Sequence, residues 1–446
     1  MSKEFYDGID YILKKSEKEF DDVIAHGVIS EAKQIKFTNN AVSTGKVWED
    51  RGVNLFVAKD QKLASTLVKE LDKKSVNAMV KKLARFVKLT KPNNEYVGID
   101  AGKSKYKKIQ NSYDPSIPKL NDELVDLVEA GVNGALSKGA ERCGGIIESG
   151  WTKEYLRTSA GIKAKQKGTS ASFSIRAFAS KDASGHKLSC ARSLHHFKPE
   201  DAGKRAGETA RQALDPAPGK PGKYNVMFDP MAFAVFLDHV GDAASMFSVE
   251  AGYSFMEGRL NRRVASDQVT LHDDPLLAGG MFSTSFDAEG RQTRRHTVIR
   301  SGILRTFLHN TSTAARYNTD STSNAGIIAP HAWNLVLDTG SFELPEMLRE
   351  VKDGLYVTNV WYMRFQNYKT GDFSVIPRDA IFKVKNGQIE GAVKDLRISD
   401  NMKDIMLNVY GVGKHREQIH GWEVETPVKT APVLVKHVKF TKSLEK

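Results

Sequence analysis

Cysteine is scarce in this sequence, with only Cys143 and Cys190 among 446 residues. Two cysteines so far apart give neither a disulfide framework nor a CxxC metal pair, and their scarcity favours a reducing compartment. No apolar run reaches the roughly 18 residues that a membrane-spanning helix requires. The first 20 residues also lack the apolar segment of a secretory signal. We therefore expect a cytoplasmic protein that does not act at a membrane.

The sequence also lacks the common signatures of enzyme active sites. It contains no GxSxG nucleophile elbow, no GxxxxGK[ST] phosphate loop and no HExxH zinc motif. The stretch Gly411-Val412-Gly413 lacks the third glycine of a dinucleotide-binding GxGxxG turn. These absences leave no common motif on which an activity could be assigned.

Positive charge is abundant but uneven along the chain. The net charge is +12, with 66 Lys+Arg and 54 Asp+Glu, and residues 1–222 hold 39 and 28 of these. The change falls at the Pro/Gly-rich stretch 215–222, which indicates a boundary between a basic N-terminal domain (1–222) and a C-terminal domain (223–446). A basic half can bind nucleic acid or an acidic partner. The lysines are scattered without alternating aromatic residues, however, which favours a solvated surface and makes nucleic acid an unlikely partner.

The N-terminal half alternates helical and strand patterns. Helical spacing of apolar residues occurs in 4–24, 73–89, 121–136 and 199–214. Strands are predicted as a meander between 31 and 68, with breaks at 39–40, 50–52 and 59–60, and again at 144–148, 155–158, 171–179 and 187–194. Residues 90–118 have the composition of a connecting loop. The pattern is that of an α+β domain.

The C-terminal half is richer in strands. Hairpins are predicted around 300–302 and 386–387, where glycine separates strand-like runs. Other strands are predicted at 224–228, 268–271, 333–337 and 356–363, and helices at 231–246, 312–317, 344–352 and 401–409. We therefore predict an α+β fold of two domains, with a strand meander in the first and a strand-rich second.

A polar cluster interrupts the apolar helix predicted at 231–246. Asp238 and Asp242 are four residues apart and share a helix face, and His239 lies beside them. Two carboxylates and an imidazole could hold a metal or exchange a proton. The alternative is a polar rim on a mostly buried helix.

Two further polar stretches are candidates for a site. His272-Asp273-Asp274-Pro275 follows a predicted strand and could gather ligands, although Asp ahead of Pro is typical of a turn. Thr293-Arg294-Arg295-His296 is a cationic run before a hairpin. It could hold a peptide carboxylate, and a solvated loop is the alternative.

Several stretches after residue 224 occur in the same order as in a known family. They are Phe228-Asp229-Pro230, Tyr253-Ser254-Phe255, Val264-Ala265-Ser266, residues 286–304, Ser323-Asn324-Ala325-Gly326, residues 334–358, residues 370–374 and residues 408–413. On these stretches the sequence resembles the TldD/PmbA metallopeptidase-like proteins over nearly its whole length.

The resemblance carries an expectation about zinc. In TldD-type members a His-Glu-x-x-x-His helix and a later cysteine bind zinc, and the glutamate is the general base. Counted from Asp229-Pro230, these three helix positions hold Asp238, His239 and Ala243 here, and no cysteine follows Cys190. The resemblance therefore implies no metal in this chain and no catalytic residue at the altered positions Asp238, His239, Asp242 and Ala243.

This pattern is similar to the PmbA (TldE) branch, whose members lack the zinc motif and pair with a TldD-type subunit. It implies a zinc-free, non-catalytic subunit (a pseudoenzyme) of a cytoplasmic heterodimer, with zinc expected only in the TldD-like partner. Unfolded or small peptides would bind by strand addition. The candidate substrate-binding or interface residues are Arg294, Arg295, Asn324 and Asp372. The bulky segment 361–365 departs from the family pattern and puts the shape of any cavity in question.

Two other hypotheses remain open. The chain could be a peptidase or other hydrolase that uses a different site around Asp238, His239 and Asp242, with His272 or Asp273 as additional groups. It could also be a basic module that binds nucleic acid, in which case binding should weaken steeply with salt.

Overall fold

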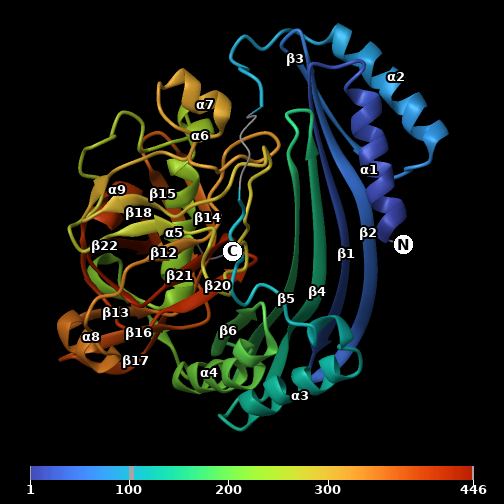
Figure 1. The fold of residues 1–446 in the computed structure, drawn as a ribbon. Helices are drawn as coiled ribbons and strands as arrows, with labels where there is room; N and C mark the ends of the chain where they lie inside the picture. Colours follow the sequence, from blue (N-terminus) through green and yellow to red (C-terminus); the bar gives the residue numbers. More distant parts are fainter. Residues whose placement is uncertain (1, 100–104, 444–446) are drawn as a thin grey trace.

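The computed structural model describes residues 2–99 and 105–443. One large curved sheet forms most of the N-terminal half, and two further sheets form the C-terminal half (Figure 1). The C-terminal half lies against the concave side of the large sheet. The predicted α+β class, with a strand meander first and a strand-rich half second, is confirmed.

The large sheet has six antiparallel strands in the order β3-β2-β1-β4-β5-β6. They are β1 (Asp22–Thr38), β2 (Ala41–Lys59), β3 (Lys62–Val68), β4 (Arg142–Thr158), β5 (Lys163–Phe178) and β6 (Ser184–Ala191). Four of these strands have 16 to 19 residues, whereas a typical strand has about 5–6. Asn39 and Asn40 close the first hairpin with positive φ angles of 49° and 67°, which asparagine tolerates better than most residues.

Two predicted interruptions of this sheet are wrong. The break expected at 50–52 lies inside β2, where Asp50 pairs with Ser30 and Gly52 with Val28. The strands predicted at 144–148 and 155–158 are parts of one strand, β4, which pairs with β1 on one side and β5 on the other. Because partners on neighbouring strands hold the chain extended, polar residues at these points mark exposed faces and not chain reversals.

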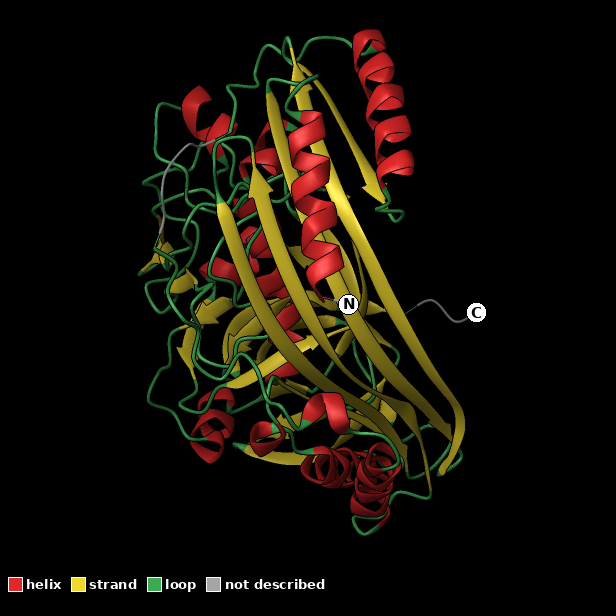
Figure 2. Cartoon of the chain, turned by 45° about the vertical axis from the view of Figure 1, so that its right-hand side comes forward, coloured by secondary structure: helices red, strands yellow, loops and turns green. Residues whose placement is uncertain are grey.

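Helices pack on the convex side and lower end of the large sheet (Figures 1 and 2). They are α1 (Ser2–Ser16), α2 (Lys73–Leu89), α3 (Glu123–Leu136) and α4 (Pro199–Gln212). Phe5 of α1 and Val76 of α2 share one apolar cluster with β1 and β2, and Val128 of α3 shares another with Phe173 of β5. Helix α1 ends at Ser16, short of the predicted residue 24, because the chain turns there and enters β1 at Asp22.

The C-terminal half contains a ten-stranded sheet and a second six-stranded sheet. The first is formed by β14-β15-β18-β22-β8-β13-β16-β17-β7 in that order, with β19 paired to β22, and the second by β11-β10-β9-β12-β21-β20. The strands are β7 (Ala217–Pro218), β8 (Gly222–Phe228), β9 (Leu271–Asp273), β10 (His296–Arg300), β11 (Ile303–Leu304), β12 (Leu335–Leu337), β13 (Gly354–Val357), β14 (Val360–Asn367), β15 (Asp372–Pro377), β16 (Ile381–Lys385), β17 (Gln388–Lys394), β18 (Leu396–Asn401), β19 (Val409–Val412), β20 (Glu417–Gly421), β21 (Val424–Thr430) and β22 (Val433–Lys442). The boundary that we predict at residues 222 and 223 falls at the start of β8 and stays a prediction.

Helix α5 (Pro230–Ala244) lies in the core between these two sheets. Its side chains share one apolar cluster with residues of both sheets, including Val226 of β8 and Val428 of β21. The remaining helices are short: α6 (Met246–Glu250), α7 (Thr311–Arg316), α8 (Leu344–Val351) and α9 (Met402–Leu407). Among the described residues, no helix is long and apolar enough to cross a membrane.

Most elements predicted in this half are present, with two differences. The hairpins at 300–302 and 386–387 are confirmed. The strand expected at 268–271 begins only at Leu271. The strand expected at 356–363 is two strands, β13 and β14, separated at Thr358 and Asn359. The Asn359 side chain is buried there and donates to Asp379 Oδ2 at 3.0 Å, so this amide holds the break in place.

Candidate functional site

The helix that carries the polar cluster is held firmly at its first turn. Asp229 caps α5 by accepting a hydrogen bond from the Met231 N–H, and Pro230 takes the first helical position. The same carboxylate forms a buried ion pair with Lys187 of β6 at 2.7 Å and accepts a hydrogen bond from the Tyr356 hydroxyl at 2.9 Å. These contacts tie α5 to the large sheet, and they explain why Asp-Pro follows β8 in the sequence.

Asp238 holds the start of strand β21. Its two carboxylate oxygens accept the backbone N–H groups of Glu425 at 2.8 Å and Thr426 at 3.1 Å, and its side chain is buried. Burial and the nearby Asp242 raise the pKa of Asp238 to about 6. Both oxygens of Asp238 are therefore engaged by backbone groups.

His239, Asp242 and Ala243 complete the altered motif without converging on a common point. The His239 ring packs edge-on against Phe365, with 5.2 Å between ring centroids, and its Nδ1 lies 3.6 Å from Asp242 Oδ2. Ala243 is buried, and its carbonyl accepts a hydrogen bond from Ser254. Asp238, His239 and Asp242 do share one side of α5, as the spacing predicts. Within residues 2–99 and 105–443, no group of three or more His, Cys, Asp or Glu side chains is arranged to hold a metal ion.

The bulky segment 361–365 lies in strand β14, beside the altered motif. Trp361 is flanked by the guanidinium groups of Arg176 and Arg378, at 4.3 and 5.5 Å from its ring centroid. Phe365 of the same strand contacts His239, and the Tyr362 N–H donates to Glu423. Aromatic side chains and their cationic neighbours therefore occupy the space next to α5 on this side.

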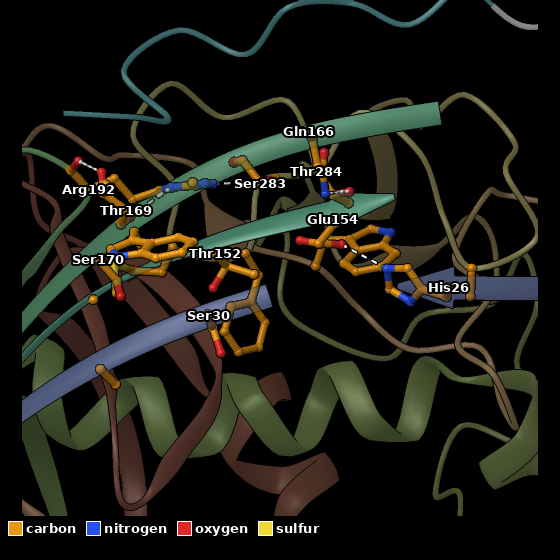
Figure 3. A pocket seen from close by; sticks show the side chains of 18 of the residues that line it. His26, Ser30, Thr152, Glu154, Gln166, Thr169, Ser170, Arg192, Ser283 and Thr284 are labelled. Atoms are coloured by element: carbon orange, nitrogen blue, oxygen red, sulfur yellow. Dashed lines mark hydrogen bonds and ion pairs between the residues drawn. The ribbon is translucent and has the colours of Figure 1, made fainter. Parts of the chain in front are cut away.

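A cleft of about 690 Å³ separates the concave face of the large sheet from the C-terminal half. Strands β1, β4 and β5 form its floor (Figure 3). The opposite wall consists of two loop stretches, 281–288 and 325–333, together with His420 of β20. The volume lies within the range of about 300–1,000 Å³ that is typical of ligand sites.

The floor of the cleft is polar because successive side chains of a strand point to opposite faces. Ser30 pairs with Thr152, and these side chains face the cleft with Ser170 and Gln166 (Figure 3). The lysines of the same stretches occupy the alternate positions on the convex face: Lys33, Lys153, Lys165 and Lys167. No lysine lines the cleft in the described part of the chain, although the N-terminal half is strongly basic.

Two charged contacts organise the cleft. His26 and Glu154 face each other across the floor with 3.2 Å between Nε2 and Oε2 (Figure 3). Burial opposes ionisation of Glu154, but the hydrogen bond and charge of His26 outweigh it and lower the pKa of Glu154. Arg192 is buried between floor and wall and donates to the carbonyls of Thr169, Gly280 and Ser283. Burial lowers the pKa of Arg192 to about 10, so the side chain stays charged and fixes the loop that forms the wall.

A buried carboxyl group holds the wall of the cleft together. Asp287 accepts backbone N–H groups from Glu289, Arg291 and Ala325 at 2.9–3.3 Å. Burial and the charge of Glu289 raise the pKa of Asp287 to about 8. The first of the two loop stretches is thereby tied to the second at Ala325.

Strand addition to the cleft floor has no structural basis, because β1, β4 and β5 each pair with a strand on both sides. The first half of β2 is different. Strand β3 pairs with β2 only from Val53 onwards, so within the described part of the chain residues 41–52 pair with β1 alone. Along this free edge Val47 is 66% and Trp48 is 44% exposed, and Trp48 also lines the cleft. An unpaired edge with exposed apolar side chains is a site at which another chain can add a strand.

The four residues predicted for substrate binding or an interface lie in two separate places. Asn324 is fully buried and donates to Asp273 Oδ2 at 2.6 Å and to the His331 carbonyl at 2.8 Å. Arg294 donates to the Ser321 carbonyl, and Arg295 lies near Asp274, 3.8 Å away. These three gather behind the cleft wall. Asp372 begins β15 and bonds Thr370 and Asn401.

None of these four residues lines the cleft, and their role stays a prediction. Asp273, which we considered as a further ligand, is wholly buried, and burial raises its pKa to about 7. It accepts the N–H groups of Trp333 and Asn334. His272 bonds Thr297 and Asp338.

The residues of the cleft floor were not predicted from the sequence. One usable signal exists: Ser170, Ser172 and Ser174 alternate with buried residues along β5. That alternation predicts a strand with one polar face. The alternation does not indicate that another part of the chain packs over that face.

The matches to family models identify the class of this protein. Residues 114–214 match the PmbA/TldA metallopeptidase central domain, and residues 221–442 match the PmbA/TldA metallopeptidase C-terminal domain. Together the two models cover most of the chain. The chain belongs to the TldD/PmbA metallopeptidase family.

Individual relatives agree with this assignment. The chain is 34% identical over 203 residues to Metalloprotease PmbA of Escherichia coli O157:H7, covering 44% of this chain and 43% of the relative. It is 29% identical over 220 residues to a metalloprotease of Methanothermobacter thermautotrophicus, covering 48% of each. The matched stretch thus spans about half the length of these curated relatives.

Solved structures share the fold over almost the whole chain. The crystal structure of TldE from Thermococcus kodakarensis has a TM-score of 0.88 and 20% identity, covering 97% of this chain and 100% of that one. A crystal structure from Thermotoga maritima MSB8 has a TM-score of 0.88 and 23% identity, covering 98% and 100%. At these identities the likeness establishes the fold alone.

Proposed function

We propose that this chain is a non-catalytic, zinc-free PmbA-type subunit that pairs with a TldD-like catalytic subunit and helps to bind peptide. The proposal rests on the contacts that the residues at the altered motif positions make within the chain. Both Asp238 oxygens are engaged by backbone N–H groups, Ala243 offers no donor atom, and His239 packs on Phe365. Zinc prefers about four nitrogen, sulfur or oxygen ligands in a tetrahedral arrangement, and these residues do not fit it.

The cleft supports a role in peptide binding. Its volume is about 690 Å³, and its floor offers hydroxyl and amide groups that can bond a peptide backbone without selecting a particular sequence. The aromatic side chains of the wall, which include Phe282 and Trp333, offer apolar contact for peptide side chains. In this proposal the peptide is unfolded or small, and zinc chemistry takes place on the partner subunit.

The free edge of β2 supports pairing with a second chain. Residues 41–52 offer backbone N–H and C=O groups along an edge that carries Val47 and Trp48. In this proposal the TldD-like subunit, or a peptide extending out of the cleft, adds a strand there. The strand addition that we predicted from the resemblance is thereby assigned to this edge in the proposal.

The alternative of an independent hydrolase is less well supported. A metal or acid–base site around Asp238, His239 and Asp242 would need carboxylate oxygens free to act, and those of Asp238 already accept two backbone N–H groups. The nucleic-acid alternative would use the exposed lysines Lys163, Lys165 and Lys167 on the convex face, away from the cleft. No aromatic ladder accompanies them in β5, as a nucleic-acid platform would require.

Blocking the cleft tests the proposed peptide site. Ser170→Trp would place a large side chain on the cleft floor, and we expect peptide affinity to fall at least about tenfold because the volume is lost. Lys165→Trp places the same side chain on the convex face of the same strand and should leave affinity unchanged. Fluorescence anisotropy of a labelled unstructured peptide, titrated with the complex of this chain and its TldD-like partner, measures both. Equal effects of the two variants would contradict a peptide site in the cleft.

A further inference from the structure

A second cavity, of about 460 Å³, lies beyond the Arg192 side chain from the cleft. It is bounded by β6, the first turns of α4, loop residues 278–279 and strands β20 and β21. Its charged lining residues are Arg192, Lys198, Asp201, Arg205, Arg416, Glu417 and Lys429. Five cationic side chains thus face two carboxylates, and the established family assignment gives this cavity no role. We call it the β20–β21 pocket.

Two of the five cations already have their partners. Arg192 donates to three backbone carbonyls and is buried. Arg205 forms a bidentate pair with Glu417, with N–O distances of 2.8 and 2.7 Å. That pair uses one of the two carboxylates and leaves Asp201 as the other.

The remaining three cations, Lys198, Arg416 and Lys429, have no such partner. Among the described residues, none of them has a carboxylate oxygen within the 4.0 Å of an ion pair. Arg416 donates to the Leu337 carbonyl at 3.2 Å. No polar partner accompanies the half-buried Lys429 in the described part of the chain. The pocket therefore has an excess of positive charge that the chain itself does not neutralise.

The strand register brings two of these cations together. Gln418 of β20 pairs with Lys429 of β21, so both side chains lie on the same face of the sheet. Arg416 immediately precedes β20 and lines the same pocket as Lys429. Burial and the charge of Arg416 lower the pKa of Lys429. The partly buried Lys429 and the exposed Arg416 therefore repel each other, and an anion bound in the pocket would relieve this repulsion.

We propose that the β20–β21 pocket binds a small oxyanion of the phosphate type. Lys198, Arg416 and Lys429 come from three separate elements and surround the space, which suits a compact ion with acceptor oxygens in several directions. No Phe, Tyr or Trp lines the pocket in the described chain, so it offers no platform on which a nucleobase could stack. The volume admits phosphate alone or phosphate carrying a small organic group. The site does not depend on the peptide role proposed above.

Isothermal titration of the full-length chain with inorganic phosphate at low salt tests this site. We expect saturable binding of one phosphate, and a loss of affinity of at least about tenfold in Lys429→Gln and in Arg416→Gln. Lys165→Gln removes a lysine from the convex face and should bind as the unaltered chain does. Acetate at the same ionic strength distinguishes a phosphate site from a carboxylate site, and tighter binding of acetate than of phosphate would contradict the assignment.

Thermal unfolding is a second measurement, and it distinguishes a phosphate-binding role of Lys429 from a purely structural one. Without phosphate, Lys429→Gln should unfold at a higher temperature than the unaltered chain, because the repulsion from Arg416 is removed. With phosphate this order should reverse, since only the unaltered chain gains stability from the ligand. Absence of saturable phosphate binding, or a loss of affinity in Lys165→Gln equal to that in Lys429→Gln, would overturn the proposal.

Discussion

At the residue scale, Asp238 shows how a motif position can change from chemistry to structure. Asp238, which the resemblance aligns with the first zinc-ligand position of TldD-type members, is a carboxylate that caps the start of β21. Such a cap satisfies two backbone donors at the partly buried start of a strand, and a fully buried donor left without an acceptor costs about 1–3 kcal/mol. Folding therefore constrains which residue can stand at this position.

Replacement of Asp238 by alanine should destabilise the chain. We expect Asp238→Ala to lower the free energy of unfolding by about 1–3 kcal/mol, because the partly buried N–H groups of Glu425 and Thr426 lose their acceptor. Asp242→Ala, one helical turn away and largely exposed, should change it by less than about 0.5 kcal/mol. Urea unfolding followed by circular dichroism measures both. If the two variants are equally stable, Asp238 does not have the structural role described here.

The raised pKa of Asp287 leads us to expect that the stability of the chain depends on pH. Its pKa is raised to about 8 in the folded chain, against about 3.9 when unfolded. Between these values the folded state holds one proton more, so stability falls as pH rises, by up to about 1.4 kcal/mol per pH unit. Asp287→Asn cannot ionise, and its slope between pH 5 and 7 should be less steep by up to that amount. Parallel slopes in the two proteins, measured by urea unfolding at several pH values, would show that Asp287 is ionised in the folded chain.

At the element scale, the first half of β2 combines a free edge with exposed apolar side chains. A strand edge of this kind is normally blunted by charges, proline or a covering element. Lys46, Glu49, Asp50 and Arg51 lie on this stretch, yet Val47 and Trp48 remain exposed between them. The combination is typical of a surface that is covered by another chain.

A charge placed on this edge should prevent pairing. Val47→Asp introduces a carboxylate at a site that is 66% exposed, so the isolated chain should keep its stability within about 0.5 kcal/mol. Recovery of the TldD-like subunit in a pull-down from the native cell should fall strongly, because the buried charge would lack a partner. Lys165→Asp on the convex face is the matched control. Undiminished recovery with Val47→Asp would place the interface elsewhere.

The sequence predicts individual elements better than it predicts the site. The periodicity of 73–89 and the glycines at 302 and 387 are local signals, and the helix and the hairpins follow from them. The length of β2 and β4 is not local, because both strands are kept extended by partners on neighbouring strands. The cleft depends on contacts between residues still farther apart in the sequence. His26, Thr152 and Ser170 become a floor only because the C-terminal half packs against that face of the sheet.

At the scale of the whole molecule, the two faces of the large sheet carry different side chains. The concave face carries neutral polar groups and the His26–Glu154 pair, and the C-terminal half closes over it. The convex face carries Lys33, Lys153, Lys165 and Lys167. Under the proposed function, a peptide in the cleft does not meet those lysines, and a partner subunit approaches along the β2 edge, where Trp48 borders the cleft.

The most direct test is to measure zinc content and peptidase activity on the same preparations, for this chain alone and mixed with a TldD-like subunit from the same cell. The proposed function predicts no stoichiometric zinc and no activity in the chain alone, and both in the mixture. One equivalent of zinc bound to this chain alone, or activity of this chain that His239→Ala abolishes, would contradict it.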